Sequence, residues 1–284
     1  MLTLEEIFKS SSQQLFSLFD PDEAKSIVYE LIDHHFEIAR SNYLSNRKRT
    51  FDAAELQQFN ADILEVLNHK PLQYTIGKAW FLDRAYFVNE AVLIPRPETE
   101  ELVVWAIDFA SGKEVNHILE IGTGSGCIAT SLALGIKKGS VTTIDVSEAA
   151  IAVAEKNIER HQAKIKVLAG DFLLEDVQEK LANKYDIIIS NPPYIPRSEE
   201  EGMSNHVKDW EPDIALFVPD NDPLLFYKSI AHFAKDNLAG DGAVFLECHY
   251  KYAVDTELYY QSLGFNTVLK KDISGNDRML KAWK

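Results

Sequence analysis

Residues 117–129 read His-Ile-Leu-Glu-Ile-Gly-Thr-Gly-Ser-Gly-Cys-Ile-Ala, and this stretch decides the fold of the chain. An apolar run of strand length comes first, glycines follow at alternate positions, and an amphipathic helical pattern opens at Cys127. Alternate glycines let the backbone turn sharply and approach a ligand closely where side chains would collide. The stretch therefore predicts a strand, a ligand-binding turn and a helix.

Outward from this stretch, apolar runs of strand length alternate with amphipathic helical segments. The pattern predicts an α/β domain in which helices flank a doubly wound, mostly parallel sheet. Its expected strands are His117–Ile121, Val141–Val146, Lys164–Ala169, Tyr185–Ser190, Ala243–Cys248 and Asn266–Lys271. Ligands of such sheets bind at the carboxyl ends of the strands. The stretch Pro196–Asp222 is long, acidic and irregular, which is typical of a lid or a substrate-binding segment.

The part of the chain before the glycines has a different periodicity. From Leu4 to about His69 apolar residues recur at helical spacing, and Pro21 with two acidic residues after it predicts a helix start. Two aromatic-rich runs, 80–82 and 86–88, flank residues 83–85 and predict a β-hairpin. We expect a helical domain over residues 1–76, a hairpin linker over 77–97 and the α/β domain over 98–284.

Composition narrows the class of protein. The chain has 284 residues, 46% of them hydrophobic, and a formal net charge of −15, which disfavours a polyanionic partner such as nucleic acid. We find no signal peptide or membrane span and expect a cytoplasmic protein with no membrane partner. The two cysteines, Cys127 and Cys248, look like buried apolar residues. His34 and His35 look like surface or core residues, and no metal is expected, because no cluster has metal-ligand spacing.

The glycine turn itself differs from the dinucleotide-binding fingerprint. That fingerprint, G-x-G-x-x-G, requires glycine at position 127, where this chain has cysteine. The run Gly122-Thr123-Gly124-Ser125-Gly126 suits a ligand without a pyrophosphate, such as S-adenosylmethionine. The alternative is a strand–helix turn that needs glycine only for its geometry.

Acidic and aromatic residues follow the next two expected strands. Asp145 is placed to accept hydrogen bonds from the ribose hydroxyls of an adenosyl group, although it could instead cap the helix that begins near Ser147. Asp171 and Phe172 follow the third strand, where the adenine should lie; Phe172 could equally belong to the core.

The run Asn191-Pro192-Pro193-Tyr194 directly follows the expected strand Tyr185–Ser190. The nitrogen of a carboxamide is a poor nucleophile, so an enzyme must orient it through its N–H hydrogens. The Asn191 side-chain oxygen and the Pro192 carbonyl can each accept one such hydrogen, and the prolines hold them rigid. Tyr194 offers an aromatic face to a planar group. The run predicts methyl transfer to an amide or amino nitrogen; the alternative is a loop that merely ends a strand.

These motifs resemble the PrmC/HemK family, the protein-(glutamine-N5) methyltransferases that act on peptide-chain release factors. The resemblance covers nearly the whole chain and is carried by Pro71–Gly77, Leu93–Glu100, Glu120–Gly126, Asp145, Asn191–Tyr194 and Lys271–Arg278. It differs from the family pattern in Phe172, where relatives often have Trp, and in Leu246–Lys251, which lacks the usual glycines.

The resemblance implies a Rossmann-like class I fold that depends on S-adenosylmethionine, with a seven-stranded sheet and a helical domain for substrate recognition. It implies S-adenosylhomocysteine as the product and the glutamine of a Gly-Gly-Gln motif in class I release factors as the substrate. Asn191, Pro192 and Tyr194 would be catalytic, Pro193 would join them in binding substrate, and Asn191 would also touch the cofactor. No role is assigned to Arg96–Glu100.

Two other functions stay open at the level of sequence. Adenine-N6 methyltransferases of nucleic acids also use Asn-Pro-Pro-Tyr, although the acidic balance and the lack of a basic groove argue against them. A module that binds the cofactor without activity is disfavoured by the intact Asn191–Tyr194 run.

Overall fold

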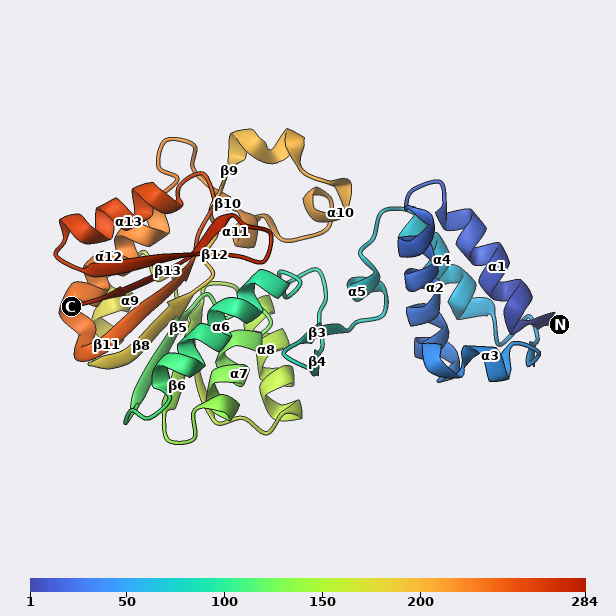
Figure 1. Cartoon of the computed structure of the whole chain (residues 1–284), viewed down its shortest axis with the longest axis horizontal. Helices are drawn as coiled ribbons and strands as arrows, with labels where there is room; N and C mark the ends of the chain where they lie inside the picture. Colours follow the sequence, from blue (N-terminus) through green and yellow to red (C-terminus); the bar gives the residue numbers. More distant parts are fainter. The chain divides into compact units, whose positions relative to one another are not determined.

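The computed structural model describes all 284 residues, which divide into two units (Figure 1). The helical unit comprises Met1–Gly77 together with Asn205–Trp210, and the sheet unit comprises Lys78–Ser204 and Glu211–Lys284. No helix of the chain combines the length and the apolar character needed to cross a bilayer.

The helical unit is built on three longer helices around one apolar core. Helix α2 begins at Pro21, as expected, because the Asp20 side chain caps it by accepting hydrogen bonds from two backbone N–H groups of the first turn. A short antiparallel pair, β1 with β2, was not expected from the sequence. The elements of this unit are β1 Leu2–Thr3, α1 Leu4–Leu15, α2 Pro21–Phe36, η1 Arg40–Asn42, α3 Tyr43–Asn46, β2 Thr50–Phe51, α4 Gln57–Leu67, α5 Leu72–Thr75 and α10 Asn205–Lys208.

The expected hairpin is present, but its turn lies earlier than predicted. Strands β3 (Ala79–Phe81) and β4 (Arg84–Tyr86) pair antiparallel around Leu82 and Asp83, and not around residues 83–85. Both turn residues have positive φ, 46° and 58°, which suits a tight two-residue connection. Arg84 and Ala85 therefore belong to a strand.

A seven-stranded sheet forms the centre of the sheet unit, in the order β12-β13-β11-β8-β5-β6-β7 (Figure 1). The neighbours from β11 to β7 run parallel, and β13 is antiparallel to both of its neighbours. This confirms the predicted doubly wound sheet. The strands are β5 His117–Ile121, β6 Ser140–Asp145, β7 Ile165–Ala169, β8 Tyr185–Ser190, β11 Leu238–Glu247, β12 Asn266–Lys271 and β13 Asp277–Trp283.

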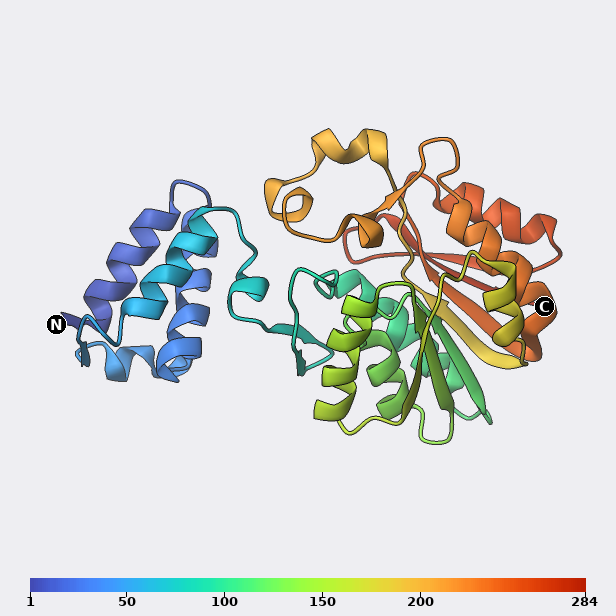
Figure 2. The ribbon, with the colours of Figure 1, turned by 180° about the vertical axis from the view of Figure 1, so that it is seen from behind.

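Helices cover both faces of this sheet (Figures 1 and 2). Successive strand residues point to opposite faces, so Ile118 packs in the core with α6 and α7, whereas Leu119 packs in the core with α12 and α13. Because both faces are buried, the central strands are continuous apolar runs, which is why they were recognisable. The helices are α6 Pro97–Ala110, α7 Cys127–Gly135, α8 Glu148–Arg160, α9 Glu175–Lys180, α12 Leu225–Asn237 and α13 Ala253–Ser262.

The stretch between β8 and α12 is more ordered than predicted. It was expected to be irregular, but it contains short elements that pair or coil locally, and the parallel pair β9–β10 closes it. Elements of two to six residues carry too little periodicity to be recognised in a sequence. In the sheet unit they are β9 Ile195–Pro196, η2 Arg197–Gly202, α11 Asp213–Leu216 and β10 Phe217–Val218.

Candidate active site

A cavity lies at the carboxyl ends of β5, β6 and β8, where a sheet of this kind binds its ligand. It collects nearly all of the residues to which the sequence assigned a role, together with residues to which it assigned none, among them Ala91–Leu93, Pro95, Arg96, Thr99 and Phe226. The predicted residues that line it are Gly122, Thr123, Gly124, Ser125, Asp145, Asp171, Phe172, Asn191, Pro192 and Pro193. Gly126 and Tyr194 are outside this lining.

Glycine is required by the backbone at all three alternate positions of the turn. Gly122, Gly124 and Gly126 have φ values of 86°, 51° and 77°, a region that residues with a Cβ rarely adopt. Gly126 is also crowded, since a Cβ there would lie 3.1 Å from the Cβ of Ala154 on α8. Gly124 instead faces open space, with nothing within 4 Å of its Cβ position. The turn thus packs against a helix at one end and leaves its middle free for a ligand.

Asp145 holds the middle of this turn. Its Oδ2 accepts from the Gly124 N–H at 2.9 Å, and its Oδ1 accepts from the Ser147 N–H at 2.9 Å. Helix α8 is capped by the hydroxyl of Ser147, which accepts from the Ala150 N–H, so Asp145 is not the cap. A carboxylate has about four lone-pair sites, so both oxygens can still accept a ligand hydroxyl.

A chain of hydroxyls and a carboxyl lies beneath the turn. Thr143 donates to Glu120 Oε2 at 2.6 Å, and its Oγ1 lies 2.7 Å from that of Thr123. Glu120 is fully buried, and its Oε1 has no hydrogen-bond partner. Burial raises the pKa of Glu120 to about 8. Sequence analysis missed this role, although a glutamate inside the apolar run His117–Ile121 was a visible signal.

Helix α8 secures the turn from the other side through a buried asparagine. Asn157 Nδ2 donates to the Ser125 carbonyl at 2.9 Å and to the Phe87 carbonyl at 2.8 Å. Its Oδ1 accepts from the Phe87 N–H at 2.7 Å. One side chain therefore fastens the glycine turn to the chain that leaves the hairpin, a link that the sequence did not reveal.

Phe172 belongs to the apolar core and also lines the cavity. Its ring meets that of Phe233 edge to face at 5.3 Å in the core. Asp171 Oδ1 accepts from the Leu173 N–H at 2.9 Å. Ile144 and Phe226 add further apolar surface to the lining. This region offers apolar walls next to a carboxylate, which suits a purine base.

Asn191 and Tyr194 are tied to residues far away in the sequence. Asn191 Nδ2 donates to Thr99 Oγ1 at 3.0 Å, and the Tyr194 hydroxyl donates to Glu247 Oε1 at 3.1 Å. The Tyr194 ring also meets that of His249 at 5.7 Å, and burial raises its pKa. The cavity wall is therefore formed by Asn191 and the two prolines, while Tyr194 joins the wall to β11.

The stretch Arg96–Glu100, to which the sequence assigned no role, makes three contacts besides the hydrogen bond from Asn191 to Thr99. Arg96 pairs with Glu211, Thr99 donates to Glu247 Oε2 at 2.6 Å, and Glu100 accepts from the Leu82 N–H at 2.8 Å. Arg96 and Thr99 also line the cavity. The start of α6 is therefore part of the site as well as a helix start.

Histidines and cysteines do not contribute to the cavity as metal ligands. Cys127 and Cys248 are buried free thiols whose pKa values are raised by burial, which confirms the reading of both as apolar residues. One group with metal-ligand chemistry occurs in the helical unit, where His34, His35 and Asp62 come together, a clustering that the sequence did not predict. There His35 and Asp62 already pair with each other at 2.8 Å.

Comparisons with known proteins show the family and the fold of this chain. The methyltransferase small domain family model matches residues 102–206, and the PrmC N-terminal domain model matches residues 9–77. The catalytic domain of hMettl16, solved with the MAT2A 3'UTR hairpin 1, covers 90% of this chain and 88% of its own, with a TM-score of 0.56. At 17% identity this likeness shows the fold alone.

Two curated relatives are similar over almost their full lengths. The release factor glutamine methyltransferase of Flavobacterium psychrophilum is 40% identical over 274 residues, which is 95% of each chain. That of Bacteroides thetaiotaomicron is 35% identical over 95% of this chain and 96% of its own. The resemblance seen in the sequence is thereby confirmed, and the chain belongs to the release factor glutamine methyltransferase family.

Proposed function

We propose that this protein transfers a methyl group from S-adenosylmethionine to the N5 nitrogen of the glutamine in the Gly-Gly-Gln motif of class I release factors. The observation that carries the proposal is the orientation of Asn191. Its Nδ2 donates a hydrogen bond to Thr99, so its Oδ1 is the side-chain atom that can accept one from a substrate, and Asn191 and Pro192 both line the cavity. Two fixed acceptors match the two N–H hydrogens of a carboxamide.

The residues of the cavity fit the cofactor. The open middle of the glycine turn accepts a close ligand, Asp145 offers acceptors for the ribose hydroxyls, and Phe172 with Asp171 suits the adenine. When bound, S-adenosylmethionine supplies an electrophilic methyl group on a sulfonium. Asn191 is also close to the glycine turn, since a Cβ on Gly122 would lie 3.9 Å from the backbone carbonyl oxygen of Asn191. The cofactor end of the cavity and the amide end therefore adjoin.

The chain's own contribution to the reaction is positioning. Asn191 and Pro192 would hold the amide by its two N–H hydrogens, so that its nitrogen could be directed at the methyl group that the cofactor would supply. Such fixed orientation lowers a barrier by roughly 7–11 kcal/mol at most, without any covalent intermediate. Tyr194, which lies outside the cavity lining, contributes by fixing the end of the run through Glu247.

The choice of protein partner rests on the relatives. The two described above are named release factor glutamine methyltransferases, and they align with both units of this chain. We assign the helical unit, which matches the PrmC N-terminal domain, to recognition of the release factor. Because release factors act on ribosomes, the reaction takes place in the cytoplasm.

Mass spectrometry of a release factor incubated with this protein and S-adenosylmethionine tests the proposal. One added methyl group is expected on the Gly-Gly-Gln glutamine, and none on a factor in which that glutamine is replaced by glutamate. An adenine-containing oligonucleotide serves as the second substrate. Methyl transfer to the oligonucleotide and not to the factor would overturn the proposal in favour of an adenine-N6 activity.

A further inference from the structure

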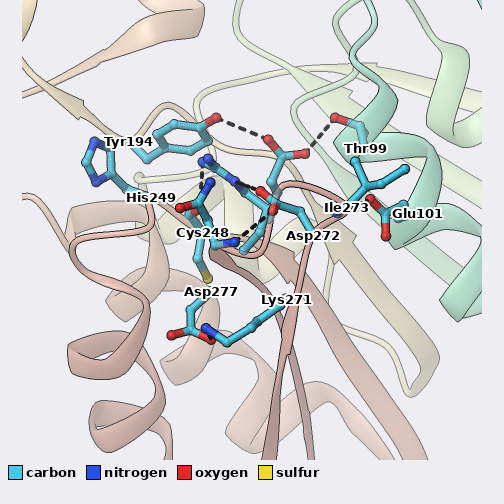
Figure 3. Close-up of polar contacts among 12 residues, drawn as sticks. Thr99, Glu101, Tyr194, Cys248, His249, Lys271, Asp272, Ile273 and Asp277 are labelled. Carbon is cyan, nitrogen blue, oxygen red and sulfur yellow. Dashed lines mark hydrogen bonds and ion pairs between the residues drawn. The ribbon is translucent and has the colours of Figure 1, made fainter.

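A single buried carboxyl group accepts hydrogen bonds from two hydroxyls, one on α6 and one in the Asn191–Tyr194 run. Glu247, at the end of β11, is 2% exposed, and it accepts from Thr99 at 2.6 Å and from Tyr194 at 3.1 Å. In Figure 3 the hydroxyls of Thr99 and Tyr194 are each joined by a dashed line to one unlabelled carboxyl, which their hydrogen bonds identify as that of Glu247. Burying a carboxyl costs free energy unless hydrogen bonds satisfy it. The two hydroxyls that bond to Glu247 therefore point to a reason for keeping it there.

The bond to this carboxyl fixes which hydrogen-bonding role the Thr99 hydroxyl has toward Asn191. A hydroxyl has one proton, and that of Thr99 is donated to Glu247, so toward Asn191 it can only accept. Asn191 must then turn its NH2 group to Thr99 and its Oδ1 the other way. The inverted amide would face Thr99 with an oxygen, and two acceptors would meet with no proton between them.

We infer that Glu247, acting through Thr99, is the positioning residue that keeps the Asn191 oxygen, and not its NH2 group, toward the substrate amide. The inference rests on the proposed function, because it explains what orients the Asn191 oxygen that the proposed reaction needs as an acceptor. An Asn191 turned the other way would offer a donor to the N–H groups of glutamine and would repel them. Discrimination for an amide over a carboxylate thus begins at a residue outside the cavity lining.

The C-terminal hairpin supports the charged state of this carboxyl. Burial raises the pKa of Glu247, while the half-buried guanidinium of Arg278 on β13 opposes that rise and favours the carboxylate. Arg278 is itself held by Asp272 at 3.2 Å and by the Cys248 carbonyl at 3.3 Å. In the turn between β12 and β13, the Ile273 N–H donates a hydrogen bond to Glu101 of α6 at 3.0 Å (Figure 3). The hairpin therefore connects α6, β11 and the wall.

Three single variants of the full-length protein, and the double variant Thr99→Val/Glu247→Gln, separate the steps of this series of hydrogen bonds. Thr99→Val removes the hydroxyl and keeps the shape, Thr99→Ser keeps the hydroxyl, and Glu247→Gln keeps the shape but lets the amide present either a donor or an acceptor to Thr99. Each is assayed for kcat with a release factor, and for inhibition by the same factor carrying glutamate in place of the Gly-Gly-Gln glutamine. Melting curves verify folding.

We expect Thr99→Val to lower kcat by about tenfold or more, with Thr99→Ser within about threefold of the wild type. The glutamate factor should inhibit Thr99→Val and Glu247→Gln more strongly than wild type, because Asn191 can then offer its NH2 group to a carboxylate. In the Thr99→Val background, Glu247→Gln should not change the inhibition by the glutamate factor further, since the two residues act in series on Asn191.

Three outcomes separate this inference from the proposed function. If the wild type methylates the release factor and Thr99→Val matches its kcat and its inhibition by the glutamate factor, the inference is overturned and the function stands. Independent, additive effects of Thr99→Val and Glu247→Gln on the inhibition by the glutamate factor would also overturn it. A wild-type protein that does not methylate the factor would instead remove the proposed function.

Discussion

Arg96 and Glu211 form an ion pair in which Nη2 and Oε1 are 2.5 Å apart. The pair joins the residue before α6 to the segment between α10 and α11, and the Glu211 side chain is 1% exposed while that of Arg96 is 33% exposed. Glu211 also accepts from the Ile94 N–H at 3.4 Å. Since Arg96 and Ala215 both line the cavity, this pair fixes two parts of its wall relative to each other.

Arg96→Met should destabilise the sheet unit by about 2–3 kcal/mol at neutral pH, because it leaves the buried Glu211 carboxyl without its counter-charge while solvent already screens part of the pair. Denaturant unfolding followed by tryptophan fluorescence measures this, since Trp80, Trp105 and Trp283 all lie in the sheet unit. Arg96→Met/Glu211→Leu, which removes both charges, should recover most of the loss. Equal midpoints for Arg96→Met and wild type would show that the pair contributes nothing.

Asn191→Ala should lower kcat by about 100-fold or more, because the variant loses the side-chain acceptor for the substrate amide. The dissociation constant of S-adenosylmethionine should stay within about threefold of the wild type, since the glycine turn and Asp145 are untouched. Single-turnover kinetics and calorimetric titration give the two values. Unchanged turnover would count against the role of Asn191, and a large loss of cofactor affinity would move that role to the cofactor.

Asp145→Ala should weaken binding of S-adenosylmethionine by about tenfold, because the variant loses both the acceptors for the ribose and the brace on the Gly124 N–H. At saturating cofactor, kcat should remain within about threefold of wild type. Ser147→Ala is the matched control, since it removes the cap of the same helix without touching the carboxylate. Comparable losses of affinity in the two variants would indicate a general disturbance of α8.

Much of the sheet could be predicted because its central strands are buried on both faces. Strands β5, β8 and β12 have the predicted limits, whereas β11 begins at Leu238, five residues before the expected start. The glycines at 240 and 242 look like a turn in the sequence, yet the strand continues through them with a shift of register. Gly242 permits this, because a Cβ there would lie 2.8 Å from the Tyr185 carbonyl.

The parts of the site that follow a strand end were predictable, and the parts that depend on tertiary pairing were not. Gly122–Gly126, Asp145 and Asn191 were visible because they come directly after apolar runs. Thr99 and Glu247 are 148 residues apart in the sequence and meet only when α6 packs on β11. The available signal was a charged residue inside an apolar strand, at Glu120 and at Glu247, which indicates a buried carboxyl but not its partner.

The buried Glu120 should make the stability of the sheet unit depend on pH. Burial raises its pKa from 4.5 to about 8, so the folded protein holds a proton there that the unfolded chain releases. The contribution of this bound proton to the free energy of unfolding is fully present below pH 4.5, declines as the pH rises toward 8 and is lost above that.

Glu120→Gln removes this pH dependence, so the free energy of unfolding of the wild type should fall by on the order of a few kcal/mol relative to that of the variant between pH 5 and 8. Denaturant midpoints across that range measure the difference, and Glu179→Gln, at an exposed position, controls for the loss of one charge. Parallel pH profiles for wild type and Glu120→Gln would show that Glu120 titrates alike in the folded and unfolded states.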